Sequence, residues 1–383
     1  MFPKQLSGLA NAEFSTVITS TQPLVADRTM RWDARGYGSH AETSIAAPAL
    51  EWYLAEGATL GGFQLFYLVQ NPNDTNAQIE VTYLLPAPQV PLVRTYAVLA
   101  HSRFNIWVNL EDPVLAAAEV SAVIRSTNAV PVIVERAMYL TRQGLTFDAG
   151  HESAGITAPA TDWFLAEGAT GPYFDLFVLI ANPSSTPAQV AVDYLLPGGT
   201  SLTRTYAVAA QSRFNIWVDL EDPQLANTAV STLVRSTNGV PLIVERAMWW
   251  PGSADTWQEG HNSAGADRTS TKWGLADGQV GGPSNVETYV LIANTSSTGG
   301  TARLTLVFED GTTAVREVPL VGSSRESVTI SLHVPEAAGR RFGVVVETFG
   351  TPPPEVVVER AMYGDAEGVR WAAGSNTAGT RLR

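Results

Sequence analysis

Short apolar runs separated by turn-forming residues make up most of this chain, and the runs are rich in Val, Ile, Thr, Tyr, Phe and Trp. Over residues 78–83, polar and apolar side chains alternate with period two, which is typical of a strand with one buried face. Seven or eight short strands with regular turns predict a two-sheet antiparallel β-sandwich. The first full set of predicted strands is Trp52–Ala55, Phe63–Gln70, Gln78–Leu85, Val93–Leu99, Arg103–Asn109, Val120–Ser126, Pro131–Leu140 and Thr146–Gly155.

The same pattern recurs at a spacing of about 110 residues, which is the size of a single β-sandwich. WYLAEGAT at Trp52 matches WFLAEGAT at Trp163, and a divergent copy begins at Trp273. Residues 1–50 match only the back half of a repeat, because LANAEFSTVITSTQPLVADRTMRW aligns with Leu225–Trp250. The predicted fold class is therefore all-β, with tandem antiparallel, immunoglobulin-like β-sandwich domains arranged in a row. The predicted domains are a half-repeat over 1–50 and repeats over 51–160, 161–270 and 271–383.

Short linkers between the repeats predict a rod-like particle, since they leave little freedom for the domains to fold back. The half-repeat is expected to form strands over Phe14–Ser20 and Pro23–Trp32, with Val17, Ile18, Leu24 and Met30 on an uncovered apolar face. Two explanations stay open at this point. Either the half-repeat is a truncation that leans on the first full domain, or a neighbouring subunit supplies the missing strands and the protein is a filament subunit.

The charge and composition of the chain argue against some classes of binding partner. The chain has 37 acidic and 24 basic residues, a net charge of −13 and no cysteine. Nucleic acid is not expected as a partner, because phosphate binding needs clustered cations. No apolar run approaches the ~20 residues of a membrane span, so membrane insertion is not expected either. The first twenty residues lack the features of a signal peptide, which leaves a mature form, a fragment or an intracellular protein.

An acidic residue followed by arginine recurs inside an apolar strand of every repeat. An arginine among apolar neighbours needs a carboxylate or carbonyl partner, and the acid of the recurring LAEG segment is the candidate. We expect these side chains to form structural salt bridges; anion binding is the alternative reading. The candidates are Arg28, Arg136, Arg246 and Arg360, with Glu56, Glu167 and Asp277.

Nothing in the motifs predicts catalysis, a metal site or a cofactor. His40, His151 and His261 occupy matching positions in the half-repeat and in repeats 1 and 2, where repeat 3 has Ser375, and one histidine per repeat is too few ligands for a metal ion. The adjacent acids Glu111 and Asp112 are explained by a helical turn that Asp112 caps, with Pro113 in its first position.

Sugar stacking is a second hypothesis, carried by Trp249, Trp250 and Trp257. Neighbouring residues of a strand point to opposite faces, so one of Trp249 and Trp250 is expected to be exposed.

The combination of W-x-L-A-E-G, an apolar strand ending in Asn-Pro, S-R-F-N-I-x-V and V-E-R-A-M-Y/W resembles an uncharacterised tandem-repeat family of secreted and cell-surface bacterial proteins. The resemblance implies an extracellular structural or adhesive role. The predicted function is a non-catalytic structural or adhesive repeat protein, with self-association, a cell-surface partner or surface polysaccharide as partners. A carbohydrate-binding array is the alternative, and a hydrolase the third reading.

Overall fold

The computed structural model describes residues 3–32, 38–142, 145–252 and 256–382, and over these residues the chain is almost entirely β-structure. Nearly all the strands belong to separate antiparallel sheets that pair face to face within each repeat. The predicted class of tandem antiparallel β-sandwiches is therefore confirmed. Among the described residues, no helix combines the length and the apolar composition that a membrane span requires.

Repeat 1 consists of two four-stranded sheets, in the orders β3-β8-β5-β6 and β10-β9-β4-β7. Its strands are β3 Glu51–Leu54, β4 Phe63–Asn71, β5 Ala77–Leu84, β6 Leu92–Val98, β7 Ser102–Trp107, β8 Ser121–Ser126, β9 Ile133–Arg142 and β10 Leu145–Ala154. Alternate residues of β4 and β5 are buried between the two sheets, as the period of two requires. The predicted helical turn is also confirmed, as the 3-10 helix η3 Pro113–Leu115, with the Asp112 side chain accepting a hydrogen bond from the Val114 N–H.

Repeats 2 and 3 repeat this arrangement, although repeat 3 adds a fifth strand to one sheet. The strands of repeat 2 are β11 Asp162–Leu165, β12 Asp175–Asn182, β13 Ala188–Leu195, β14 Ser201–Val208, β15 Ser212–Trp217, β16 Ser231–Ser236, β17 Ile243–Trp250 and β18 Glu259–Ala264. Those of repeat 3 are β19 Lys272–Gln279, β20 Glu287–Asn294, β21 Gly300–Phe308, β22 Thr313–Leu320, β23 Ser324–Thr329, β24 Arg341–Phe349, β25 Val356–Ala366, β26 Val369–Ala378 and β27 Thr380–Arg381.

In the described part of the half-repeat, the strands are β1 (Asp27–Arg31) and β2 (Ser39–Thr43), which form a hairpin, and a short 3-10 helix, η1 (Pro3–Gln5), precedes them. The expected strand over Phe14–Ser20 was wrong, because these residues belong to no strand and are exposed. The strands that would cover them, equivalent to those preceding β16 in repeat 2, are absent from the half-repeat. A strand segment without partners has no ladder to join.

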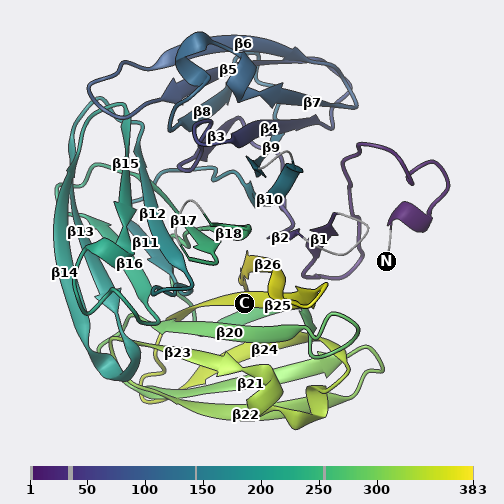
Figure 1. The fold of residues 1–383 in the computed structure, drawn as a ribbon, viewed down its shortest axis with the longest axis vertical. Coiled ribbons are helices and arrows are strands. Elements are labelled where there is room, and N and C mark those ends of the chain that lie inside the picture. Colours follow the sequence, from purple (N-terminus) through teal and green to yellow (C-terminus); the bar gives the residue numbers. More distant parts are fainter. Residues whose placement is uncertain (1–2, 33–37, 143–144, 253–255, 383) are drawn as a thin grey trace.

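The row of domains is bent into a ring (Figure 1). One strand from each repeat lies at the centre, where β10 contacts β18, β18 contacts β26, β26 contacts β2, and β2 contacts β10. The Ser39 hydroxyl donates to the Gly374 carbonyl at 3.0 Å, joining residues 335 positions apart. The prediction of an extended rod was therefore wrong. Linker length limits the distance between neighbouring domains, but it does not set the angle between them.

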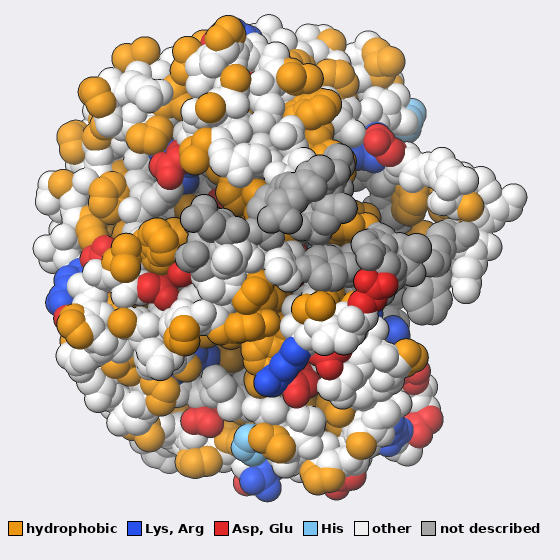
Figure 2. All heavy atoms as spheres, in the orientation of Figure 1, with side chains coloured by type: hydrophobic (Ala, Val, Ile, Leu, Met, Phe, Trp, Pro, Cys, Tyr) orange, Lys and Arg blue, Asp and Glu red, His pale blue; other side chains and the backbone are white. Residues whose placement is uncertain are grey.

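Three sandwiches fill three positions around this centre, and the β1–β2 hairpin takes the fourth. The sheets that would flank the hairpin on the outside of the ring are missing, so the ring is open at the right of Figure 1. The N-terminal segment before β1 stands away from the ring there, and Figure 2 shows it projecting from the same edge.

Candidate functional site at the junctions between repeats

The recurring charged residues gather where neighbouring repeats meet around the centre of the ring. We name these four contacts by chain order. The first junction joins the half-repeat to repeat 1, the second joins repeat 1 to repeat 2, the third joins repeat 2 to repeat 3, and the fourth joins repeat 3 back to the half-repeat. Each is built around an arginine of one repeat and an acid from the equivalent strand of the next.

In the second junction, Arg136 of β9 is fully buried between two carboxylates. Its Nη2 lies 3.1 Å from Oε2 of Glu56, in its own repeat, and its Nη1 lies 2.5 Å from Oε2 of Glu245, in repeat 2. Glu245 also accepts the backbone N–H of Glu56 at 2.9 Å. The Asn262 side-chain amide, from β18, donates to the Glu56 carboxylate. Two repeats therefore share one hydrogen-bonded ion network.

The third junction has the same construction one repeat later. Arg246 of β17 lies 3.1 Å from Glu359 of repeat 3, and Glu359 accepts the Ala166 N–H at 2.7 Å. The Asn376 amide donates to Glu167 at 2.5 Å. Here the LAEG acid, Glu167, is bonded mainly by residues of repeat 3.

The fourth junction closes the ring. Asp27, which aligns with Glu245 and Glu359, accepts the Ala276 N–H of repeat 3 at 3.1 Å. Asp277 accepts a hydrogen bond from the Thr29 hydroxyl at 3.0 Å. Arg360 donates to Thr377 of its own repeat at 3.0 Å. Asp27 thus binds the LAEG segment of repeat 3 as the acid of a fourth repeat would.

The first junction differs from the others in the source of one carboxylate. The half-repeat has no LAEG segment, so Arg28 lacks the acid that Arg136 finds in Glu56. Its guanidinium lies 3.0 Å from Glu135 and also pairs with Glu152 of β10. Glu152 occupies the position that Asn262 and Asn376 hold in repeats 2 and 3. A carboxylate of repeat 1 therefore replaces the one that the half-repeat lacks.

In repeats 2 and 3, a second arginine also binds the backbone of the preceding repeat. Arg213 donates to the Gly57 carbonyl at 2.8 Å, and Arg325 donates to the Gly168 carbonyl at 2.7 Å. Arg103 is the equivalent residue of repeat 1, but no LAEG segment precedes it. Its guanidinium bonds the Asn105 side chain at 2.8 Å, as Arg213 bonds Asn215, and lies 3.4 Å from Glu13.

Burial and neighbouring charges shift the acids of the junctions in different directions. Burial raises the pKa of Glu245 and of Glu167, and the adjacent arginines only partly offset it. For Glu56 burial also acts upward, but His151 and Arg136 outweigh it and the pKa is lowered. In the first junction, burial and the nearby Glu152 raise the pKa of Glu135 to about 7 and that of Glu42 to about 8. This junction therefore carries more acid than its single arginine neutralises.

The tryptophan prediction needs a correction, because Trp249, Trp250 and Trp257 are all buried. Trp249 packs on Phe63 of repeat 1, with ring centroids 5.0 Å apart, and stacks on Trp257 at 5.6 Å. Trp250 meets Tyr363 of repeat 3 at 5.4 Å. The two neighbours do point to opposite faces, but a flanking repeat covers each face. None of the three can therefore stack on a sugar.

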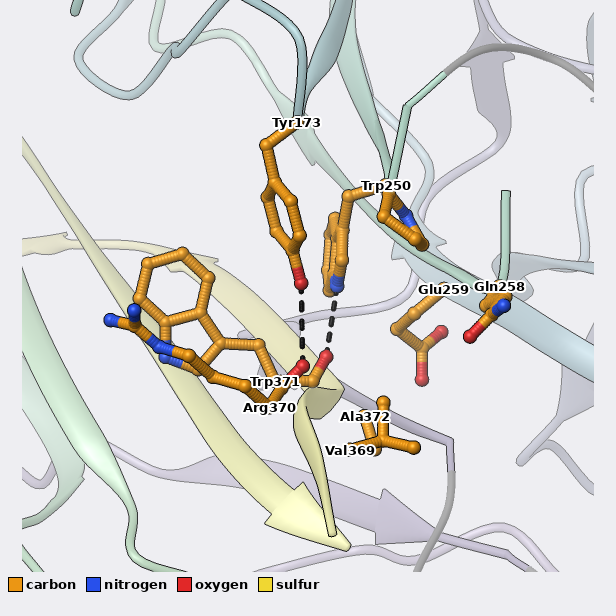
Figure 3. A pocket seen from close by; sticks show the side chains of 9 residues that line it. Tyr173, Trp250, Gln258, Glu259, Val369, Arg370, Trp371 and Ala372 are labelled. Atoms are coloured by element: carbon orange, nitrogen blue, oxygen red, sulfur yellow. Dashed lines mark hydrogen bonds between the residues drawn. The ribbon is translucent and has the colours of Figure 1, made fainter. Parts of the chain in front are cut away.

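A pocket between repeats 2 and 3 has the size of one water molecule, at about 20 Å³ (Figure 3). The Tyr173 hydroxyl donates to the Arg370 carbonyl at 3.3 Å, and the Trp250 indole N–H donates to the Trp371 carbonyl at 2.9 Å. The polar groups of its aromatic walls thus hold the two repeats together. No cluster of three or more potential metal ligands lies in the part of the chain that the structure describes.

Sequence reasoning missed the partners contributed by the next repeat: Glu245, Glu359, Asn262 and Asn376. It also missed Glu152. A signal for Glu152 existed in the repeat alignment, where a glutamate stands in repeat 1 and an asparagine in the other two. Without knowledge that the repeats form a ring, that difference had no meaning.

No protein-family model matches the chain, and no curated protein matches it. Among solved structures, a protein of Thermotoga maritima is similar with 18% identity and a TM-score of 0.26, over 29% of this chain and 96% of that one. The Anabaena sensory rhodopsin transducer is similar with 22% identity and a TM-score of 0.20, over 24% and 97%. The major pilin from Streptococcus pyogenes has 8% identity and a TM-score of 0.16, over 82% and 98%. With TM-scores this low, function is inferred from the junction residues alone.

Proposed function

We propose that this chain is a non-catalytic structural and adhesive protein of the cell surface, in which the repeats lock into one ring-shaped unit. The supporting observation is the use of the recurring residues. Of the residues that recur, the arginines Arg136 and Arg246 and the acids Glu245 and Glu359 are buried at contacts between repeats. Residues repeated for this purpose build a rigid framework and leave the outer sheets and loops for contact with other surfaces.

The third junction supports this proposal most directly. Arg246 and Glu359 are both almost completely buried and come from different repeats. Leaving such a charge unpaired is costly, so one repeat cannot turn away from the next without a large penalty. A framework with fixed angles between its domains suits a load-bearing or adhesive part better than a chain of freely jointed beads.

The test uses the organism that produces the protein. Intact cells are treated with protease and labelled with antibodies against the full chain, and attachment of wild-type and gene-deleted cells to a surface is compared. The proposal expects protease-accessible label, and weaker attachment that the intact gene restores. Label found only after lysis, or turnover of a panel of chromogenic glycosides and esters by the purified chain, would overturn it.

A further inference from the structure

We infer that the open fourth position of the ring is a docking site for the front half of a repeat of the same kind. The front half comprises the five strands equivalent to β11–β15. We further infer that the docked segment has an uncharged residue in place of the LAEG acid. This goes beyond the proposed function, because it names a partner and the residues that select it.

The first observation is the edge strand β7. Its equivalent in repeat 2, β15, is covered by repeat 1, where Pro86 forms a bridge with Arg213 and the Leu85 carbonyl accepts the Arg213 N–H at 3.4 Å. In repeat 3, β23 is covered by η4 (Pro197–Gly199) of repeat 2. No full repeat precedes β7, and Phe104 and Trp107 on it are 37% and 40% exposed. β7 therefore lacks the cover that the preceding repeat gives to β15 and β23.

The second observation is the unpaired edge of β1. In repeat 2, β17 lies between β12 and β18, and all its residues are buried. Within the described residues, β1 pairs with β2 alone, and four of its five residues are exposed. The side chain of Arg28 is 49% exposed, whereas that of Arg136 is fully buried. The vacant edge is the one that a strand equivalent to β12 would occupy.

The third observation is the segment that precedes β1. Val17 and Ile18 are 71% and 59% exposed, while the aligned residues of β16, Leu233 and Val234, are 7% and 0% exposed. Two adjacent β-branched residues so exposed have no partner in the described chain. In every full repeat the residue aligned with Ile18 lies in the core of the sandwich: Ile124, Val234 and Val346 are all fully buried. The segment therefore carries the apolar face that a front half would bury.

Polar groups at the vacancy specify what would fit. Arg103 stands where Arg213 and Arg325 bind a glycine carbonyl of the preceding LAEG segment, so the docked chain would offer that carbonyl. Glu152 stands where Asn262 binds the LAEG acid of the preceding repeat. A second carboxylate beside the buried Glu152 would be repelled. This selects a docked segment that is neutral at the LAEG acid.

The same interface already exists twice in the chain, at the second and third junctions. The commitment to a front half rests on this continuity, since β7, β1 and residues 14–24 each lack the partner that their equivalents have. A second copy of the whole chain fits less well, because its own front halves are already paired with their back halves.

The experiment keeps the full chain and adds a front half. Residues 161–224 of repeat 2 are fused ahead of Leu9 in place of residues 1–8, once unchanged and once with Glu167→Gln in the added segment. Hydrogen exchange of residues 14–24 and of β7 is measured. We expect exchange to slow by about tenfold or more in the Gln fusion, and by less in the Glu fusion. Arg103→Ala should reduce the protection that the fusion adds, measured as the difference between fused and unfused chains that both carry Arg103→Ala.

Equal exchange with and without the added segment, in chains that remain folded elsewhere, would overturn the inference. Equal protection by the Gln and Glu fusions would overturn the part of the inference that requires an uncharged residue in place of the LAEG acid. If the unfused chain instead shows concentration-dependent protection of residues 14–24 together with dimers in sedimentation, the occupant is a second copy and the inference is wrong. None of these outcomes depends on where the protein acts in the cell.

Discussion

At the scale of single residues, the second junction buries an arginine between acids of two different repeats. Arg136 has one acid in its own repeat and another in the next. Because strand periodicity fixes only the face on which a side chain lies, the sequence could indicate that Arg136 is buried with an acid. It could not indicate which domain covers that face, and Glu245 was therefore missed.

Removing Arg246 should strongly destabilise the third junction. Arg246→Ala leaves the buried carboxylate of Glu359 without its cation, which costs about 3–5 kcal/mol of unfolding free energy for a buried pair. The matched control is Arg235→Ala, since Arg235 pairs with Asp162 at 3.0 Å on the surface, and an exposed pair contributes about 0–1 kcal/mol. Denaturant unfolding of both variants measures the difference. Similar losses for the two would contradict a buried, load-carrying pair.

At the centre of the ring, Gly374 should be required because a larger side chain would not fit, and not because its backbone conformation demands glycine. A Cβ on Gly374 of β26 would lie 2.4 Å from the Trp250 ring of repeat 2. Gly374→Ala should therefore lower the melting temperature by several degrees. Gly364→Ala on β25 is the control, because its nearest atoms are 3.5 Å away. If both variants melt together, close packing between repeats 2 and 3 is not as described.

At the scale of elements, alternation and turn residues were sufficient to place the strands, because both sheets of a sandwich bury every second residue. The strand and exposure predictions failed where a segment lacks its partner strands or where an adjacent repeat covers it. Phe14–Ser20 has strand composition but lacks the strands that would pair with it. Trp249 and Trp250 alternate as expected, yet adjacent repeats cover both faces of β17. The local sequence pattern predicts a strand, but whether a face of that strand is buried depends on how the repeats are arranged.

The β1–β2 hairpin should be held more weakly as the pH rises. Glu42 and Glu135, with pKa values of about 8 and about 7, keep protons in the folded state that the unfolded chain would release above an ordinary pKa of 4.5. Their contribution to stability is thus fully present below pH 4.5 and is lost progressively as the pH rises from 4.5 to about 8. The lowered pKa of Glu152 acts only at much lower pH. Arg28 pairs with both Glu135 and Glu152, and His40 lies 3.2 Å from Glu152.

Hydrogen exchange of β1 and β2 at about pH 5.5 and about pH 8.5, corrected for the intrinsic rate, measures this effect. We expect lower protection at the higher pH, and a smaller difference in the double variant Glu42→Gln, Glu135→Gln. Protection that increases with pH, or a pH dependence unchanged in the double variant, would show that these two acids do not control the hairpin.

At the scale of the whole molecule, the ring is a property that no single repeat reveals. The alignment showed three and a half copies, and the short linkers favoured a rod. The angle between domains is set by contacts such as Arg136 to Glu245, and these depend on side chains far apart in sequence. The closure through Asp27 then explains why the half-repeat is kept as a hairpin at the centre of the ring.

Small-angle scattering separates the two shapes. A compact chain of 383 residues has a radius of gyration of about 21 Å, whereas a rod of three and a half sandwiches would have about 35–40 Å. We expect a value near the lower figure at all concentrations tested. The double variant Arg136→Ala, Arg246→Ala should give a larger radius if the repeats separate while each remains folded.

Ring closure itself is tested most directly by cross-linking its two ends. The chain has no cysteine, so Thr43→Cys and Ala378→Cys provide the only two thiols, at positions where the Thr43 hydroxyl now lies 2.9 Å from the Ala378 carbonyl oxygen. With a short bismaleimide in dilute solution, the closed ring predicts rapid linkage within one chain, identified by mass spectrometry of the joined peptides. Both cysteines reacting separately, with no intramolecular link in the folded protein, would contradict the ring.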